Sequence, residues 1–140
     1  MSYTGRCACG KVTLRIEGEP IATRQCWCRQ CQQATGGGPT HNAMFATDDV
    51  TIDGELASHE YGAASGNTIT QFFCPSCGSP IGGMSSARPH FRAIRFGALD
   101  EPHGLKPQVA IWTDDAPEWA VIDPSLEQVS RQPTAPPKPD

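Results

Sequence analysis

The sequence has no long run of apolar side chains and no excess of positive charge. None of its apolar stretches approaches the roughly 20 residues that a helix needs to cross a bilayer. The formal net charge is −4, from 15 acidic and 11 basic residues, whereas nucleic-acid-binding domains are usually basic. Residues 1–11 also lack the basic start and apolar core of a secretory signal. We therefore expect a cytoplasmic protein that binds neither nucleic acid nor membrane.

Long segments with helical periodicity are missing as well. The 140 residues include 14 glycines and 13 prolines, which favour turns. Short stretches with alternating apolar side chains predict strands instead; in residues 11–18, for example, Val12, Leu14 and Ile16 share one face. Similar stretches occupy residues 42–54, 57–63, 67–74 and 91–100, with one or two more at 108–113 and 118–123.

One short helix is expected over residues 29–36, where the glycines that follow would end it. The chain is long enough for one ordinary domain. We place that domain at residues 1–128 and expect a small, glycine-rich, mainly antiparallel β fold. The remaining residues, 129–140, form a proline-rich tail with almost no large apolar side chains, which predicts a flexible terminus.

Cysteine is abundant and clustered. Seven cysteines fall into three groups: CACG at residues 7–10, CWCRQC at 26–31 and CPSCG at 74–78. In a reducing compartment, clustered cysteines bind metal or do catalysis more often than they form disulfides. The three groups are therefore candidate metal-binding or catalytic segments.

The segment CPSCG is typical of a zinc knuckle, in which two cysteines hold one ion and the following glycine lets the backbone turn tightly. A structural zinc site needs four ligands. Cys7 and Cys9 are the natural partners of Cys74 and Cys77, because a glycine again follows the second cysteine. One ion would then join two distant parts of the chain and stabilise the domain. The alternative is that these are four unliganded thiols in a β core.

The remaining cysteines, Cys26, Cys28 and Cys31, number three. Three protein ligands and an open fourth position are typical of a catalytic zinc. Three thiolates quench the charge of the ion, so such a site is poor at generating hydroxide and better suited to binding another thiol as thiolate. This pattern indicates sulfur chemistry on a small thiol.

Other interpretations of these three cysteines stay open. They could form a thiol redox centre, or a second structural zinc site completed by a histidine in a non-catalytic scaffold. The available histidines are His41, His59, His90 and His103. A nucleobase deaminase site is excluded because it needs an H-x-E segment, and no histidine here is followed two residues later by Glu.

The stretches GRCACGKVTLRIEGEP, CWCRQCQQATGGG, FFCPSCGSPIGG and IRFGALDEP resemble those of the glutathione-dependent formaldehyde-activating enzyme family, to which centromere protein V belongs. The resemblance covers roughly residues 4–125. It implies the family's small, mostly antiparallel β fold, shared with methionine-R-sulfoxide reductases. It also implies a carbon–sulfur lyase that joins formaldehyde and glutathione into S-(hydroxymethyl)glutathione.

The resemblance assigns the cysteines to two zinc sites, Cys7, Cys9, Cys74 and Cys77 to a structural one and Cys26, Cys28 and Cys31 to a catalytic one. A glutathione substrate would bring two carboxylates, and Arg29, inside the C-x-C-x-x-C loop, is the predicted substrate-binding residue. Many family members read C-H-C where this chain has Trp27 between two cysteines. An indole offers one N–H and a large apolar face, so proton handling or substrate choice could differ. The alternative is that Trp27 simply points into the core.

Overall fold

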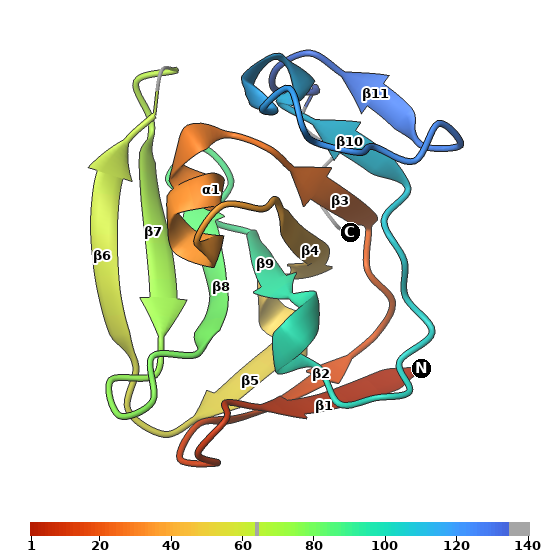
Figure 1. Ribbon diagram of the computed structural model, residues 1–140. Helices are drawn as coiled ribbons and strands as arrows, with labels where there is room; N and C mark the ends of the chain where they lie inside the picture. Colours follow the sequence, from red (N-terminus) through yellow and green to blue (C-terminus); the bar gives the residue numbers. More distant parts are fainter. Residues whose placement is uncertain (64, 135–140) are drawn as a thin grey trace.

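The computed structural model describes residues 1–63 and 65–134, which form eleven strands and one α-helix (Figure 1). Three single-turn 3-10 helices also occur. The elements are β1 (Ser2–Arg6), β2 (Thr13–Glu17), β3 (Ala22–Cys26), α1 (Arg29–Thr35), β4 (Thr40–Ala46), β5 (Val50–Asp53), β6 (Ala57–Gly62), β7 (Thr68–Phe73), β8 (Pro80–Ser85), β9 (Phe91–Arg95), β10 (Val109–Ile111) and β11 (Glu127–Val129). No helix in this part of the chain has the length and apolar character needed to cross a bilayer.

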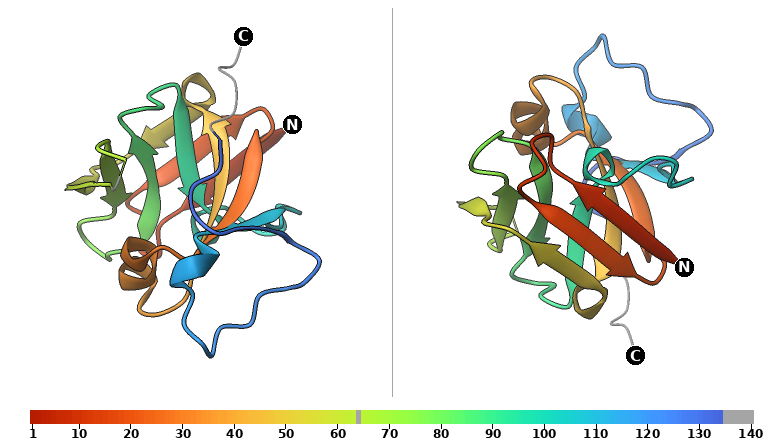
Figure 2. Two further views of the ribbon diagram at one scale, coloured as in Figure 1. Left: turned by 90° about the horizontal axis from the view of Figure 1, so that it is seen from above. Right: turned by 90° about the horizontal axis from the view of Figure 1, so that it is seen from below.

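The strands form two sheets. The smaller has the order β1-β2-β5 and the larger the order β11-β10-β3-β4-β9-β8-β7-β6. Neighbouring strands are antiparallel, except that β10 runs parallel to both β3 and β11. Seen from below, the small sheet lies across one face of the large one (Figure 2). The expected mainly β fold is confirmed, with a mixed rather than purely antiparallel large sheet.

The hydrophobic core lies between the two sheets. The alternation expected around β2 is present, with Leu14 and Ile16 buried on one face and polar residues exposed on the other. Across the interface, Phe45 of β4 is fully buried, and its ring lies 5.6 Å from that of Tyr3 in β1. Because successive side chains of a strand point to opposite faces, Asn42 and Met44 of β4 face the other side of the large sheet from Phe45. That second face carries the cavity described below.

Two local predictions have clear outcomes. The helix expected at residues 29–36 is α1, which ends at Gly36 with φ 86°, a left-handed conformation that glycine adopts without strain. The prediction of a strand at residues 118–123 is wrong, because that segment forms no strand. Its apolar side chains are exposed, Trp119 to 68% and Val121 to 89%. Apolar alternation there buries no face, so it cannot hold a strand against a sheet.

The region expected to be a tail begins inside β11, which ends at Val129. Beyond it, the backbone N–H of Trp112 donates to the carbonyl of Arg131 at 3.2 Å. The Trp112 indole also donates to the side-chain oxygen of Gln132 at 3.0 Å. The last part of the expected tail, residues 135–140, lies outside the described residues.

Candidate metal centres and the cavity beside them

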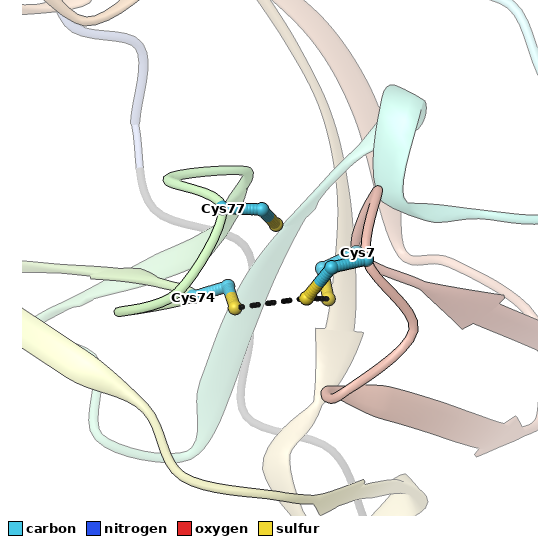
Figure 3. A group of neighbouring side chains, drawn as sticks. Cys7, Cys74 and Cys77 are labelled. Carbon is cyan, nitrogen blue, oxygen red and sulfur yellow. Dashed lines mark hydrogen bonds between the residues drawn. The ribbon is translucent and has the colours of Figure 1, made fainter.

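The structure gathers the seven cysteines into two groups. Cys7, Cys9, Cys74 and Cys77 have sulfur atoms that all lie within 4.8 Å of one another, and three of them are labelled in Figure 3, which shows their sulfurs pointing toward a common centre. The sulfur atoms of Cys7 and Cys9 lie 3.6 Å apart, and those of Cys9 and Cys74 lie 3.8 Å apart. Tetrahedral zinc with Zn–S bonds of about 2.3 Å places its sulfurs about 3.8 Å apart. The donor set therefore fits such an ion.

This four-cysteine cluster is built from two hairpin turns with the same design. The first turn joins β1 to β2 and the second joins β7 to β8. In each, the glycine after the second cysteine has a positive φ, 80° at Gly10 and 76° at Gly78, and donates its N–H to the carbonyl of the first cysteine, Cys7 or Cys74. The glycine lets the turn curl so that both sulfurs face inward. One ion there would tie the small sheet to the large sheet.

The three-cysteine cluster is formed around the connection from β3 to β4. Cys26 is the last residue of β3, Cys28 is the N-cap of α1, and Cys31 lies in its first turn. The Cys28 sulfur accepts a hydrogen bond from the backbone N–H of Cys31 at 3.3 Å. Thr40, which pairs with Cys26 across the sheet, donates its hydroxyl to the Cys31 sulfur at 3.1 Å. A short local sequence and one cross-strand pair thus bring three sulfurs within 4.8 Å of one another.

The three thiols do not ionise equally. Hydrogen bonds with Cys26 and Cys28, the hydroxyl of Thr40 and the charge of Arg95 lower the pKa of Cys31 to about 3. The hydrogen bonds with Cys28 and Cys31 raise the pKa of Cys26, and its burial raises it further. Negative charge therefore concentrates on Cys31, and only a bound cation would allow all three sulfurs to be thiolates.

No histidine completes this cluster among the residues that the structure describes. His41, the half-buried histidine on β4, faces away from it, and its Nε2 lies 3.1 Å from the side-chain nitrogen of Gln25. The Gln25 oxygen in turn accepts the indole N–H of Trp27 at 2.9 Å. The amide therefore donates to His41, whose Nε2 acts as the acceptor. Trp27 is buried and 3% exposed, so its indole anchors this polar chain and does not reach the sulfurs through its N–H.

Beside the three cysteines lies a cavity of about 170 Å³ on the second face of the large sheet. Its wall includes Cys26 and Cys31, polar residues from four strands and three arginines, but no carboxylate among the described residues. The charged and polar side chains of the wall are Arg24, Asn42, Tyr61, Gln71, Ser85, Arg88, Arg95 and Gln132. The same wall also contains apolar side chains, among them Met44, Ile69, Met84, Phe91 and Ile111. A concave site that combines apolar walls with a few converging charged and polar groups is typical of a small-molecule binding site.

Hydrogen bonds link the Cys31 sulfur to the far wall of this cavity. Thr40, which donates to Cys31, accepts a hydrogen bond from the amide nitrogen of Asn42 at 2.9 Å. The Asn42 oxygen accepts from Arg95, which also donates to the oxygen of Gln71 at 3.3 Å. These bonds orient the groups that surround Cys31.

The network ends at a tyrosine. The Gln71 nitrogen donates to the hydroxyl oxygen of Tyr61 at 3.4 Å, which leaves the phenolic hydrogen available to a ligand. Burial raises the pKa of Tyr61, and the neighbouring charges of Cys28, Cys31 and Cys26 raise it further, against a smaller lowering by Gln71. The phenol therefore stays protonated and can donate a hydrogen bond into the cavity.

Arg29 lies outside this cavity. Its side chain is exposed and donates to the Gln32 oxygen one helical turn later, at 2.8 Å. The arginines of the wall are instead Arg24, Arg88 and Arg95. The substrate-binding role of Arg29 stays a prediction that this placement does not favour.

Thr40, Asn42, Tyr61 and Gln71 were not among the residues that the sequence singled out. One signal for two of them is present, since Thr40 and Asn42 are polar at alternate positions of a strand whose other face carries the buried Ala43 and Phe45 together with His41. Tyr61 and Gln71 carry no such signal, because they reach the cysteines only through the register of β6 and β7 in the sheet.

The model of one protein family, the glutathione-dependent formaldehyde-activating enzymes, matches residues 2–115. The chain belongs to this family. Family membership supports glutathione-linked formaldehyde chemistry of the lyase type as the general activity. The matched region contains both cysteine clusters and the cavity wall, apart from Gln132.

A solved structure of a protein from Rhodobacter sphaeroides, described as a structural-genomics target, has a similar fold. The TM-score is 0.57 at 21% sequence identity, over 74% of this chain and 91% of that chain. At this identity the likeness concerns the fold alone. No curated protein matches this chain.

Proposed function

We propose that this protein is a zinc-dependent carbon–sulfur lyase that acts on the adduct of a thiol and a small aldehyde, in the manner of an S-(hydroxymethyl)glutathione synthase. The observation that carries the proposal is the contrast in ligand number. One cluster has four sulfurs around a common centre, and the other has three sulfurs, two of which line a polar cavity. A three-sulfur site leaves one position for a substrate sulfur.

A zinc ion held by Cys26, Cys28 and Cys31 would supply one thing, the stabilisation of a substrate thiol as thiolate. The chain's own residues would do the rest. Thr40 donates to Cys31 and fixes the direction of its sulfur. The hydrogen bonds with Cys26 and Cys28 chiefly lower the pKa of Cys31, and the charge of Arg95 adds to this effect, which keeps this ligand deprotonated.

In the synthetic direction, the thiol loses its proton to solvent, which later returns a proton to the group that protonates the product oxygen, and the thiol sulfur forms a bond to the carbonyl carbon. The π electron pair of the carbonyl moves to oxygen, which must be stabilised and then protonated. Tyr61 is the candidate donor, because its phenol is protonated and its hydrogen is not used by Gln71. In the reverse direction the carbon–sulfur bond breaks and the proton returns.

The test measures zinc per chain and the rate at which formaldehyde and glutathione approach equilibrium. We expect two zinc ions and an accelerated approach for the native protein. Cys28→Ser should retain one zinc and lose the acceleration. Because serine is also a good N-cap, α1 should stay intact, and circular dichroism checks this.

Tyr61→Phe tests the hydrogen-bond donor separately. It should retain both zinc ions and lower kcat/KM about 10- to 100-fold, the range for losing a hydrogen bond to a developing charge. A native protein with two zinc ions and no effect on any thiol–aldehyde pair would reject the enzyme and leave a binding module. Cys26, Cys28 and Cys31 that form a reversible disulfide without metal would favour the redox alternative.

A further inference from the structure

Two arginines in the cavity wall, Arg24 and Arg88, have no anionic partner among the residues that the structure describes. We propose that they form a carboxylate-binding subsite beside Cys26 and Cys31, so that the cavity takes a compact thiol that itself carries a carboxylate. This inference rests on the proposed function for the role of the thiol and names the class of thiol that the site selects.

The placement of the arginines follows from the sheet. Arg24 lies two residues before Cys26 on β3 and therefore on the same face. It pairs across the sheet with Asn42, which pairs in turn with Arg95. Arg88 lies in the turn between β8 and β9 and lines the same cavity. Three positive charges thus surround a space whose described wall contains no Asp or Glu, although the chain as a whole is acidic.

The arginines of the cavity wall differ in the hydrogen bonds and ion pairs that they make. Arg95 donates to Asn42 and Gln71. Within residues 1–63 and 65–134, the ion pairs include neither Arg24 nor Arg88. The Nε atom of Arg24 is buried without a hydrogen-bond partner. Arg24 and Arg88 line the same cavity, and their charges are close enough to repel each other.

A buried N–H without a hydrogen-bond partner, such as the Nε–H of the half-buried Arg24, is costly. Two like charges close together add to that cost. An anion between them would remove both costs. Guanidinium groups match the geometry of a carboxylate, which they can bind through two parallel hydrogen bonds. The neighbouring thiol site means that the same ligand can carry the sulfur and the carboxylate.

The size of the cavity limits the ligand. Its volume of about 170 Å³ is below the range of about 300–1,000 Å³ that is usual for drug-sized ligands. A mercaptocarboxylate such as mercaptopropionate suits this space better than a tripeptide does. The site is therefore expected to prefer mercaptopropionate to glutathione.

The experiment is isothermal titration calorimetry of the zinc-loaded protein with three probes, mercaptopropionate, its uncharged analogue mercaptopropanol, and glutathione. We expect mercaptopropionate to bind at least about tenfold more tightly than mercaptopropanol, as one charge-assisted hydrogen-bond pair would give. Arg24→Gln and Arg88→Gln should each reduce that preference to less than about threefold. Binding of glutathione should be weaker than that of mercaptopropionate.

Arg92→Gln is the matched control. Arg92 is a neighbouring arginine on β9 that is absent from the cavity wall and bonds to Thr47 and to the backbone near Pro89. It should leave the preference for mercaptopropionate unchanged. A native protein that binds mercaptopropanol as tightly as mercaptopropionate overturns the carboxylate subsite, and so does a preference that survives both substitutions. Glutathione as the tightest ligand overturns the inference of a compact ligand.

The two proposals fail in different ways. Acceleration of the mercaptopropionate–formaldehyde equilibrium without any preference for the charged thiol rejects this inference and keeps the lyase. A strong preference that both substitutions remove, without any acceleration, keeps the subsite and rejects the lyase. Because the native protein is informative by itself, a variant that does not fold does not remove the test.

Discussion

The two cysteine clusters use the same ligand atom in opposite surroundings. In the four-cysteine cluster, Cys9 and Cys77 are exposed and Cys7 and Cys74 are buried, and the sulfurs accept hydrogen bonds from within their own hairpins, such as the bond from the N–H of Val12 to Cys7. In the three-cysteine cluster, two sulfurs are buried and line a cavity with three arginines.

For each cluster, the number of sulfur ligands and the surrounding residues point to the same role. A closed set of sulfurs in two hairpins suits an ion that holds two sheets together. An incomplete set beside a polar cavity suits an ion that meets a ligand. Three experiments test whether the two clusters differ in this way.

The largest effect is expected from Cys77→Ser. Cys77 is exposed, so the substitution costs little packing, but it removes one sulfur of the four. We expect a loss of more than about 3 kcal/mol in the free energy of unfolding, because metal binding at such a site contributes directly to folding. Thermal denaturation and zinc content measure this. Cys28→Ser is the comparison and should lose zinc with little change in melting temperature; equal destabilisation by both would remove the distinction.

A smaller effect is expected from acidification, which should release zinc from one cluster before the other. Protons compete with metal for thiolates, and the raised pKa of Cys26 favours its protonation. In the four-cysteine cluster, the pKa of Cys9 is also raised, to about 11. Each cluster likewise contains one thiol with a lowered pKa, Cys31 at about 3 and Cys77 at about 5, so these pKa values do not separate the clusters and the number of ligands decides. With one ligand fewer, the three-cysteine cluster should release its zinc first as the pH falls.

A chromogenic zinc chelator can follow this release during stepwise acidification. Two steps of one zinc each are expected, and Cys28→Ser should lack the step at higher pH. A single step that releases both ions, or a Cys28→Ser protein that lacks the step at lower pH, would contradict the order.

The smallest of the three effects is expected from Thr40→Val. This nearly isosteric change removes the hydroxyl that donates to Cys31 at 3.1 Å. The pKa of Cys31 should rise, and the zinc affinity of the three-cysteine cluster should fall about tenfold, as is usual when a group that orients a metal ligand is lost. Competition with a fluorescent chelator measures the affinity. Thr70→Val, a half-buried threonine on β7 outside the cavity wall, should leave it unchanged.

Much of the metal-binding pattern could be predicted from the sequence because its causes are local. Two cysteines separated by one or two residues and followed by glycine can hold one ion through the geometry of a single turn. The helix over residues 29–36 was likewise predictable from a short segment that ends in glycine. The strand predicted at residues 118–123 failed because alternation alone does not supply a neighbouring sheet to pack against.

The composition of both clusters and the mainly β character of the chain could be predicted from the sequence, since these depend on spacing and on alternation over a few residues. What surrounds the three cysteines depends on the tertiary structure. Arg24, Tyr61 and Arg88 come from different parts of the sheet and meet at one cavity through strand register. Arg29, adjacent to the cysteines in sequence, points to Gln32 instead. Proximity along the chain does not determine the direction of a side chain, because alternation in strands and the helical turn send neighbours to different faces.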